Sequence, residues 1–328
     1  MLKYIAKRLV YMVGVFFVVS IIMFALFNNV PGDRALNQVQ NMRGKVSAEQ
    51  FEAAYQQARD KLGLDDPIPV RYVKWMGNLL SGDFGYSTSY KKDVIEVLGE
   101  PLKNTIFINI FATIAALAIT IPLGIYCAVK KFSTFDNAVQ VFTIVGYSVP
   151  SYIISLVFIY IFSVKLGWFP IGGMNSPNFQ GTEFEFFLDR MHYLGLPLIV
   201  MTVGSLGGMT RYVRASMIDA LRADYIRTAR AKGLKEKVVI YSHAWRNALL
   251  SVITLIIGWF MGIFMGSIII EQIFQINGIG FMYYKGLMNQ DYDVALAVQM
   301  LYCVITLISN LITDLSYGLV DPRVRITK

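Results

Sequence analysis

The 328-residue chain alternates between long apolar stretches and shorter polar ones. Each apolar stretch carries few or no charges and has close to the roughly 20 residues that an α-helix needs to cross the hydrocarbon core of a bilayer. The stretches cover residues 9–27, 104–129, 137–164, 191–210, 247–270 and 294–313. This pattern predicts an all-α polytopic membrane protein with six transmembrane helices, which places both termini on one side of the membrane.

Composition agrees with this pattern, since 55% of the residues are hydrophobic and the mean hydropathy is +0.50. A basic start followed by an apolar stretch is also typical of a signal peptide. Residues 9–27 are longer than the apolar region of most signal peptides, however, and no small-x-small cleavage site follows them. We therefore expect this first stretch to remain as a membrane helix.

Net positive charge is confined to one face of the predicted bundle, because residues 31–103 on the other face are balanced in charge and the loops at 165–190 and 271–293 are net acidic. On the positive face, lysine and arginine precede the first span, separate the second span from the third, and crowd the loop at 211–246, which has nine basic residues against three acidic. Further basic residues follow the last span: Arg323, Arg325 and Lys328. The positive-inside rule makes this face cytoplasmic. The net charge of +8 then reflects topology, and binding of nucleic acid has little support. We call residues 211–246 the basic loop.

The charge pattern divides the chain into three parts. Residues 1–30 form an N-terminal transmembrane helix, residues 31–103 form an extracytoplasmic segment, and residues 104–328 form a five-helix core that carries the basic loop. In the 31–103 segment, Ser47 and Gln50 have the spacing of a capping box and Gly63 ends a helical apolar pattern. A second helix is predicted at 70–80. We therefore expect this segment to be small and helical.

Within the basic loop, Asp224 is predicted to cap a short helix at 225–232, and Gly233 suits the left-handed residue that stops such a helix. Ala229 and Ala231 would keep the helix slim, so that it could enter a pocket on another protein. From composition alone, a basic helix lying on anionic lipid is the more ordinary interpretation.

Two separated motifs resemble one family. RTARAKGL at 227–234 and HAWRNALL at 243–250 are similar to the coupling-helix signature of ABC-importer permeases in the dipeptide/oligopeptide/nickel branch. LGLDDPIPVRYVKWMGNLLSGDFGYS at 62–87 is similar to the extracytoplasmic segment of the same branch. The resemblance implies the type I ABC-importer permease fold and docking of the basic loop into a cytoplasmic ATPase subunit. The residues implied in docking are Asp224, Tyr225, Arg227, Thr228, Ala229, Arg230, Ala231, Lys232, Gly233, Leu234, His243, Arg246 and Asn247.

The resemblance also implies the partners and the activity. This chain would be the permease subunit of an importer in a bacterial or archaeal cytoplasmic membrane, with a second homologous permease chain, two ATPase subunits and an extracytoplasmic substrate-binding protein. It would move di- or oligopeptides inward by alternating access, and nickel chelates or oligosaccharides are the alternative cargoes. ATP and Mg would be bound by the ATPase subunits, so this chain would hold no cofactor of its own.

Several residues in or beside the spans are candidates for the transport pathway. Pro150 predicts a kink in the third span, where Ser148, Ser151 and Ser155 could face a water-filled cavity or bond to their own helix. Glu271, at the outer end of the fifth span, could line a gate or extend to the membrane surface. Glycines four residues apart in the fourth and fifth spans, at 204, 208, 258, 262 and 266, indicate close helix packing.

Other function classes lack the residues that they need. No Walker A motif is present, so the chain itself is not expected to hydrolyse ATP. His192 and His243 lie near opposite membrane faces, and Cys127 and Cys303 fall inside spans, so neither a metal site nor a catalytic dyad is expected. Asp314, which shares a helix face with Asn310, is predicted to have a hydrogen-bonded structural role. A proton-coupled secondary transporter is therefore less favoured.

Overall fold

The computed structural model describes residues 2–30 and 32–320 of the chain. The terminal basic residues Arg323, Arg325 and Lys328 lie outside the described residues. Five of the described helices are long and apolar enough to cross a membrane, and a sixth span is possible if one bent pair is counted. The five are α1 (Leu2–Asn29), α5 (Val94–Val129), α8 (Glu183–Arg222), α11 (Arg246–Gly262, continued from Glu236) and α14 (Tyr292–Val320). The predicted all-α polytopic fold is confirmed.

The third predicted span is not one straight helix. It divides into α6 (Thr134–Ser148) and α7 (Ser151–Phe158), which continues into the π-helical turn η2 (Ile159–Lys165), and the two parts are bent by 101°. Pro150 lies at the break and Val149 before it has extended backbone angles. A proline removes a helical N–H and disfavours helix at the residue before it, so the predicted kink at Pro150 is a full change of direction.

The fifth predicted span is also shorter than expected, since α11 ends at Gly262. The chain then turns and forms two short helices, α12 (Ile268–Ile273) and α13 (Ile279–Met288). Gly266 explains the tight turn, because a Cβ there would lie 2.2 Å from the backbone nitrogen of Gly280. The other predicted packing glycines behave differently. A Cβ at Gly204, Gly208, Gly258 or Gly262 would meet no atom within 4 Å, so these glycines are not close-packed within this chain.

The 31–103 segment is helical, as predicted. It contains the helices α2 (Arg34–Val39), η1 (Gln40–Met42), α3 (Ala48–Leu62) and α4 (Ile68–Leu80). A small antiparallel hairpin follows, with two strands of two residues each, β1 (Tyr86–Ser87) and β2 (Lys92–Asp93). The Ser47–Gln50 capping box forms at the start of α3, and Gly63 ends the helix with a φ of 59°. The helix expected at 70–80 begins two residues earlier, at Ile68, with Pro69 in its first turn.

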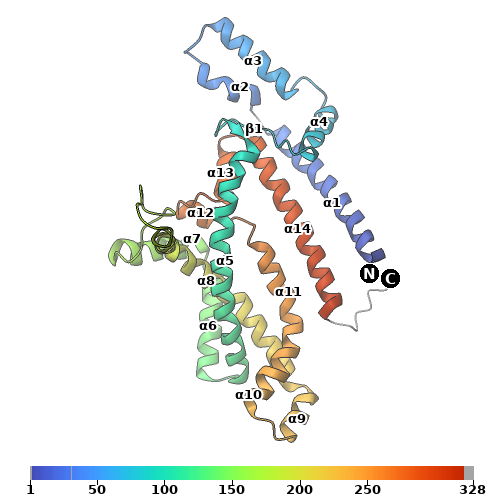
Figure 1. The fold of residues 1–328 in the computed structure, drawn as a ribbon, viewed down its shortest axis with the longest axis vertical. Coiled ribbons are helices and arrows are strands. Elements are labelled where there is room, and N and C mark those ends of the chain that lie inside the picture. The colour runs from blue at the N-terminus through green and yellow to red at the C-terminus, as the bar shows by residue number, and fades with distance from the viewer. Residues whose placement is uncertain (1, 31, 321–328) are drawn as a thin grey trace.

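Figure 1 shows the arrangement of these parts. The helices α2, α3 and α4 lie at one end of the molecule, and α9 (Asp224–Ala231) with α10 (Glu236–Val238) lies at the opposite end. Helices α5 and α8 pack against each other along the core, while α1 lies beside α14 on one flank. A guanidinium N–H of Arg8 on α1 lies 2.9 Å from the carboxylate of Asp314 on α14. Asp314 therefore has a structural partner, although the sequence did not identify it.

Candidate functional site

Residues 211–222 of the basic loop continue α8, and the rest of the loop forms a short helical hairpin. The first helix of the hairpin starts one residue earlier than predicted. Helix α9 runs from Asp224 to Ala231, and its N-cap is Ala223, whose side chain makes no capping bond. The prediction that Asp224 caps this helix is therefore wrong. Asp224 occupies the first helical position instead, where its carboxylate lies 3.4 Å from Arg227 and is favourably placed in the field of the helix N-terminus.

The end of α9 agrees with the prediction. Gly233 has a φ of 72°, and its N–H donates to the carbonyl of Arg230 over 2.9 Å, while the Leu234 N–H donates to Ala229 over 3.4 Å. These two bonds form a Schellman motif, which needs a left-handed residue at the position of Gly233. Across the turn, Arg230 pairs with Glu236 at 2.6 Å. Backbone and side chain together set the direction in which the chain leaves α9.

One face of α9 is buried in the protein, whereas Ala229 and Ala231 were both predicted to keep the helix slim for a pocket on another protein. Ile226 is fully buried and Ala229 is 5% exposed, and both belong to an apolar cluster that includes Met217 on α8 and Val252 on α11. Ala229 therefore packs inward and does not face a partner. The outward face of α9 is made by other residues from the predicted set: Asp224, Tyr225, Arg227, Thr228, Arg230 and Ala231. Lys232 and Leu234 are exposed just beyond it.

The segment at 243–250, which resembles the second part of the coupling signature, packs beside the first part at 227–234. After α10, the π-helical turn η3 (Val239–Trp245) leads directly into α11, and its Val239 and Ala244 are buried in the same apolar cluster as Ile226. The side-chain amide of Asn247 donates to the backbone carbonyl of His243 over 2.7 Å. Arg246 is exposed and His243 is partly buried. The two segments that resemble the coupling signature thus form one packed unit at the ends of α8 and α11.

A groove of about 390 Å³ lies beside this unit. Its walls come from the end of α8, the start of α9 and the start of α11, and they include Tyr212, Asp219, Tyr225 and Asn247. Two predicted docking residues, Tyr225 and Asn247, therefore line a concave surface of this chain. The hairpin presents both a convex helix and an adjoining depression.

A buried ion pair fixes the stem of the hairpin, by which we mean the last part of α8 before α9. Asp136 at the start of α6 is fully buried and accepts two hydrogen bonds from Arg214 on α8, each of 2.7 Å. Its carboxylate also accepts from the backbone N–H of Phe132 over 2.8 Å. This bidentate pair joins the α5–α6 connection to the helix that continues into α9. Sequence analysis did not find it.

The predicted pathway residues do not form one cluster. Ser148 and Ser151 are exposed on either side of the bend at Pro150, whereas Ser155 is buried and its hydroxyl donates to the carbonyl of Ser151 over 2.8 Å. Ser155 therefore bonds to its own helix, which is the second of the two predicted alternatives, and does not face a water-filled cavity. No described contact tests a pathway role for the other two.

Glu271 lies in the interior and not at the membrane surface. It is 2% exposed, and its carboxylate accepts from the hydroxyl of Thr105 and from the N–H of Phe281, each over 2.8 Å. Because Phe281 is in the first turn of α13, the carboxylate stabilises a helix N-terminus. Of the two alternatives for Glu271, extension to the membrane surface is wrong, and a gating role stays untested.

Comparison with known proteins decides the family. Residues 120–326 match the family described as the inner membrane component of binding-protein-dependent transport systems, and residues 1–115 match the N-terminal part of the same component. The chain belongs to this family. It is thus a permease subunit and a multi-pass membrane protein.

Two relatives named as peptide permeases match over nearly the full length of the chain. The permease is 38% identical to the oligopeptide transport system permease protein AppB of Bacillus subtilis, with 99% of each chain covered. It is 33% identical to the di/tripeptide transport system permease protein DppB of Pseudomonas aeruginosa, again with 99% of each covered. Among solved structures, an inward-facing MetNI methionine ABC transporter matches with a TM-score of 0.51 and 15% identity, over 68% of this chain and 97% of that one. This last likeness shows the fold alone, which is that of a type I importer permease.

Proposed function

We propose that this permease forms half of the membrane pathway of an ABC importer that moves di- or oligopeptides into the cell. The packed hairpin at α9 to α11 carries the proposal, since it joins an exposed, basic helix to the ends of three long helices. The relatives named for oligopeptide and di/tripeptide transport support peptide as the cargo. Two ATPase subunits would bind ATP and Mg, and this chain would bind neither.

The hairpin gives a physical route for coupling. Ile226 and Ala229 of α9 pack in one cluster with Ile125 on α5, Met217 on α8 and Val252 on α11. Interiors of this kind are close-packed and transmit displacement without compressing. When an ATPase subunit moves α9, the ends of these helices therefore move with it. In the assembled importer this motion would turn the pathway from one face of the membrane to the other.

A second permease chain would complete the pathway. The open space around Gly204 and Gly208 on α8 and around Gly258 and Gly262 on α11 supports this, since no part of the described chain fills it. A substrate-binding protein would dock on the 31–103 segment, at the end of the molecule opposite the hairpin. That arrangement requires both termini and the hairpin to be cytoplasmic.

We expect two cysteine substitutions to report this topology. In a chain whose partly exposed Cys303 is replaced by alanine, Glu52→Cys on α3 should react with an impermeant thiol reagent in intact cells. Lys235→Cys in the hairpin should react only after permeabilisation. Both positions are exposed, so failure to label cannot be attributed to burial. The reverse pattern would overturn the orientation.

Reconstitution in liposomes tests the function itself. The permease alone should show no ATP hydrolysis. Together with a second permease, two ATPase subunits and a loaded binding protein, it should hydrolyse ATP and accumulate labelled trialanine. If the liposomes accumulate a nickel chelate but not trialanine, the assignment of peptide as the cargo is wrong. Proton-driven uptake by this single chain would overturn the ABC mechanism.

A further inference from the structure

A buried turn at residues 274–278 joins α12 to α13. Phe274 and Ile276 in this turn are fully buried. Gln275 between them has a φ of 53°, a left-handed conformation that is uncommon for a residue other than glycine. The turn is therefore held by its surroundings and not by its own conformational preference. Those surroundings include α8, since Phe274 and Ile276 belong to one apolar cluster with Leu194.

Two neighbouring polar side chains on α5 bind the backbone around this turn. The side-chain amide of Asn104 donates to the carbonyl of Asn277 over 2.9 Å. The hydroxyl of Thr105 accepts from the N–H of Ile279, the first residue of α13, over 2.8 Å. Both side chains are buried, and backbone groups left unpaired at that depth would be costly. The position of the turn relative to α5 is thus set by specific hydrogen bonds.

Arg190 on α8 fixes the orientation of the Asn104 amide. An N–H of its guanidinium donates to the amide oxygen over 2.6 Å, and the guanidinium carbon lies 4.5 Å from the centre of the Phe107 ring. A guanidinium only donates and a carbonyl only accepts. The amide therefore presents its oxygen to Arg190 and its NH₂ group to Asn277, and a flipped amide would lose both bonds. Asn104 thus connects a donor on α8 to an acceptor in the 274–278 turn.

The contacts of Arg190 are not those of an arginine that mainly stabilises the fold. The side chain is partly buried, it forms no ion pair with a carboxylate among the described residues, and its Nε–H has no hydrogen-bond partner among them. A buried donor without a partner is costly, and replacing a buried charge by an apolar residue is often neutral or stabilising. A charged residue in a membrane-spanning helix indicates a function. The guanidinium is therefore better explained by what it positions.

Helix α8 connects Arg190 to the hairpin at its other end. The helix has 40 residues and is therefore roughly 60 Å long. Close to Arg190, its Leu194 packs on the turn, and at the far end its Met217 packs beneath α9. Pro197 lies inside the helix but is buried, so packing limits the bending that a proline permits. A displacement of the hairpin can therefore reach the turn through one packed element.

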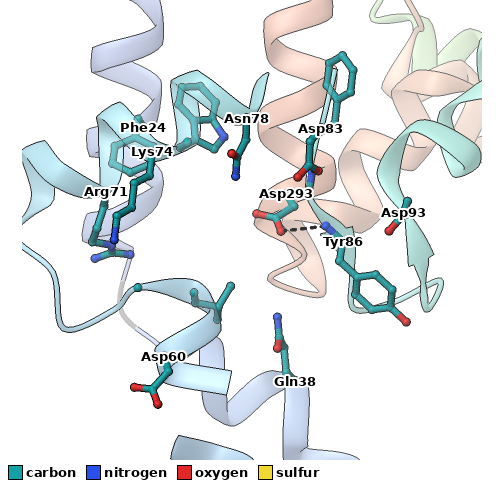
Figure 2. Close-up of a pocket in the computed structure, with 15 residues that line it drawn as sticks. Phe24, Gln38, Asp60, Arg71, Lys74, Asn78, Asp83, Tyr86, Asp93 and Asp293 are labelled. Atoms are coloured by element: carbon teal, nitrogen blue, oxygen red, sulfur yellow. Dashed lines mark hydrogen bonds between the residues drawn. The ribbon is translucent and has the colours of Figure 1, made fainter. Parts of the chain in front are cut away.

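On its other side, the turn leads to the 31–103 segment. Helix α13 follows directly and packs against α14, whose first turn lines a cavity of about 370 Å³ together with residues of that segment. Figure 2 shows the carboxylate of Asp293 in this first turn, where it accepts from the N–H of Tyr86 over 3.3 Å. Gly85 permits the approach, because a Cβ there would lie 2.7 Å from a carboxylate oxygen of Asp293. The turn thus lies between the hairpin and the segment on which a binding protein is proposed to dock.

We propose that Arg190 is a positioning residue for transport, which makes the 274–278 turn follow the movement of α8 through Asn104. Motion of the hairpin then displaces α13 and the first turn of α14. Docking of a loaded binding protein on the 31–103 segment acts on the hairpin by the reverse route. The inference rests on the proposed function, because the ATPase subunits and the binding protein supply these two movements.

Hydrogen exchange in the purified full-length permease in nanodiscs, without any partner, tests the positioning. In Arg190→Met the Asn104 amide has no donor to orient it. Backbone amides of the turn and of the first turn of α13 should then exchange roughly 3- to 10-fold faster, the factor that one neutral hydrogen bond contributes to an equilibrium. Asn104→Asp should act similarly, because its carboxylate accepts from Arg190 but cannot donate to Asn277. Unchanged exchange in the turn would overturn the proposal, whatever the importer transports.

ATP hydrolysis by the assembled importer separates positioning from a merely structural role. Arg190→Met and Asn104→Asp should keep the basal rate and lose most of the stimulation by a loaded binding protein. Arg190→Lys should retain more of the stimulation, because an ammonium can still donate to Asn104. The thermal unfolding midpoint should fall less in Arg190→Met than in Arg214→Met, because the acceptor left without a partner on Asn104 is neutral and that on Asp136 is charged.

Lys165→Met is the matched control, because it also removes a cation that lies over an aromatic ring, and it should leave the stimulation unchanged. If the basal rate, the stimulation and the unfolding midpoint of Arg190→Met all fall together, Arg190 is only structural and the proposal is wrong. Normal stimulation in Arg190→Met would equally contradict it. If the wild-type importer is not stimulated by a loaded binding protein, the proposed function fails, and the exchange measurement decides whether Arg190 positions the turn.

Discussion

Arg214→Met is expected to destabilise the permease more than any surface substitution. Asp136 is fully buried and loses both of its donors on Arg214, and breaking a buried pair by removing one partner costs about 3–5 kcal/mol. Thermal unfolding of the purified chain in detergent should show a clear drop in the midpoint. Tryptic cleavage in the basic loop should accelerate, because Arg214 is on the helix that leads into α9.

Two variants separate the buried charge from other effects. Asp136→Asn combined with Arg214→Met removes the charge but keeps an oxygen for the N–H of Phe132, so this pair of changes should recover most of the lost stability. Lys74→Met breaks an exposed pair with Asp66 and should be nearly neutral for unfolding. If Arg214→Met unfolds no earlier than Lys74→Met, the buried pair does not hold the stem of the hairpin.

The sequence predicted those features that depend on local pattern. The Ser47–Gln50 capping box, the helix end at Gly63 and the left-handed Gly233 all follow from residues within a few positions of one another. The membrane helices follow from apolar length. The break at Pro150 was located correctly, but its angle of 101° was not, because a proline specifies where a helix stops and the surrounding packing decides where the chain goes next.

Long-range pairs could not be found in this way. Asp136 and Arg214 are 78 residues apart, and nothing in either neighbourhood identifies the other. The burial of Glu271 was not predicted for the same reason, since its partners Thr105 and Phe281 come from other elements. The buried face of α9, however, could have been predicted from the sequence. Ile226 and Ala229 have the three-residue spacing of one helix face in an otherwise polar segment, and that spacing indicates burial.

The coupling proposal itself is best tested at Gly233, where folding and transport should respond differently. Gly233 has a φ of 72°, and a Cβ there would meet no atom within 4 Å. Substitution is therefore not opposed by packing. It is opposed by the backbone, because a left-handed conformation costs a bulky L-residue about 1–2 kcal/mol. Gly233→Val should insert into the membrane at normal levels, because the strain is local and the helices of the core are untouched.

Transport should suffer much more than insertion. The strain is relieved by breaking the Schellman bonds to Arg230 and Ala229, and this changes the direction of the chain between α9 and α10. A cost of 1–2 kcal/mol lowers the population of the docking conformation roughly 5- to 30-fold. Peptide uptake and co-purification of the ATPase subunits should fall by about this factor when both are measured on the same membranes.

Two controls make the result specific to the left-handed residue. Asparagine is the residue other than glycine that ends helices in this conformation, so Gly233→Asn should retain most of the uptake that Gly233→Val loses. Lys235→Ala changes an exposed side chain two residues further on and should have little effect. Ala229→Glu is not a suitable docking variant, because it would bury a charge in the apolar cluster beneath α9. If Gly233→Val transports normally, the hairpin is a basic helix on the membrane surface, and the coupling assignment is wrong.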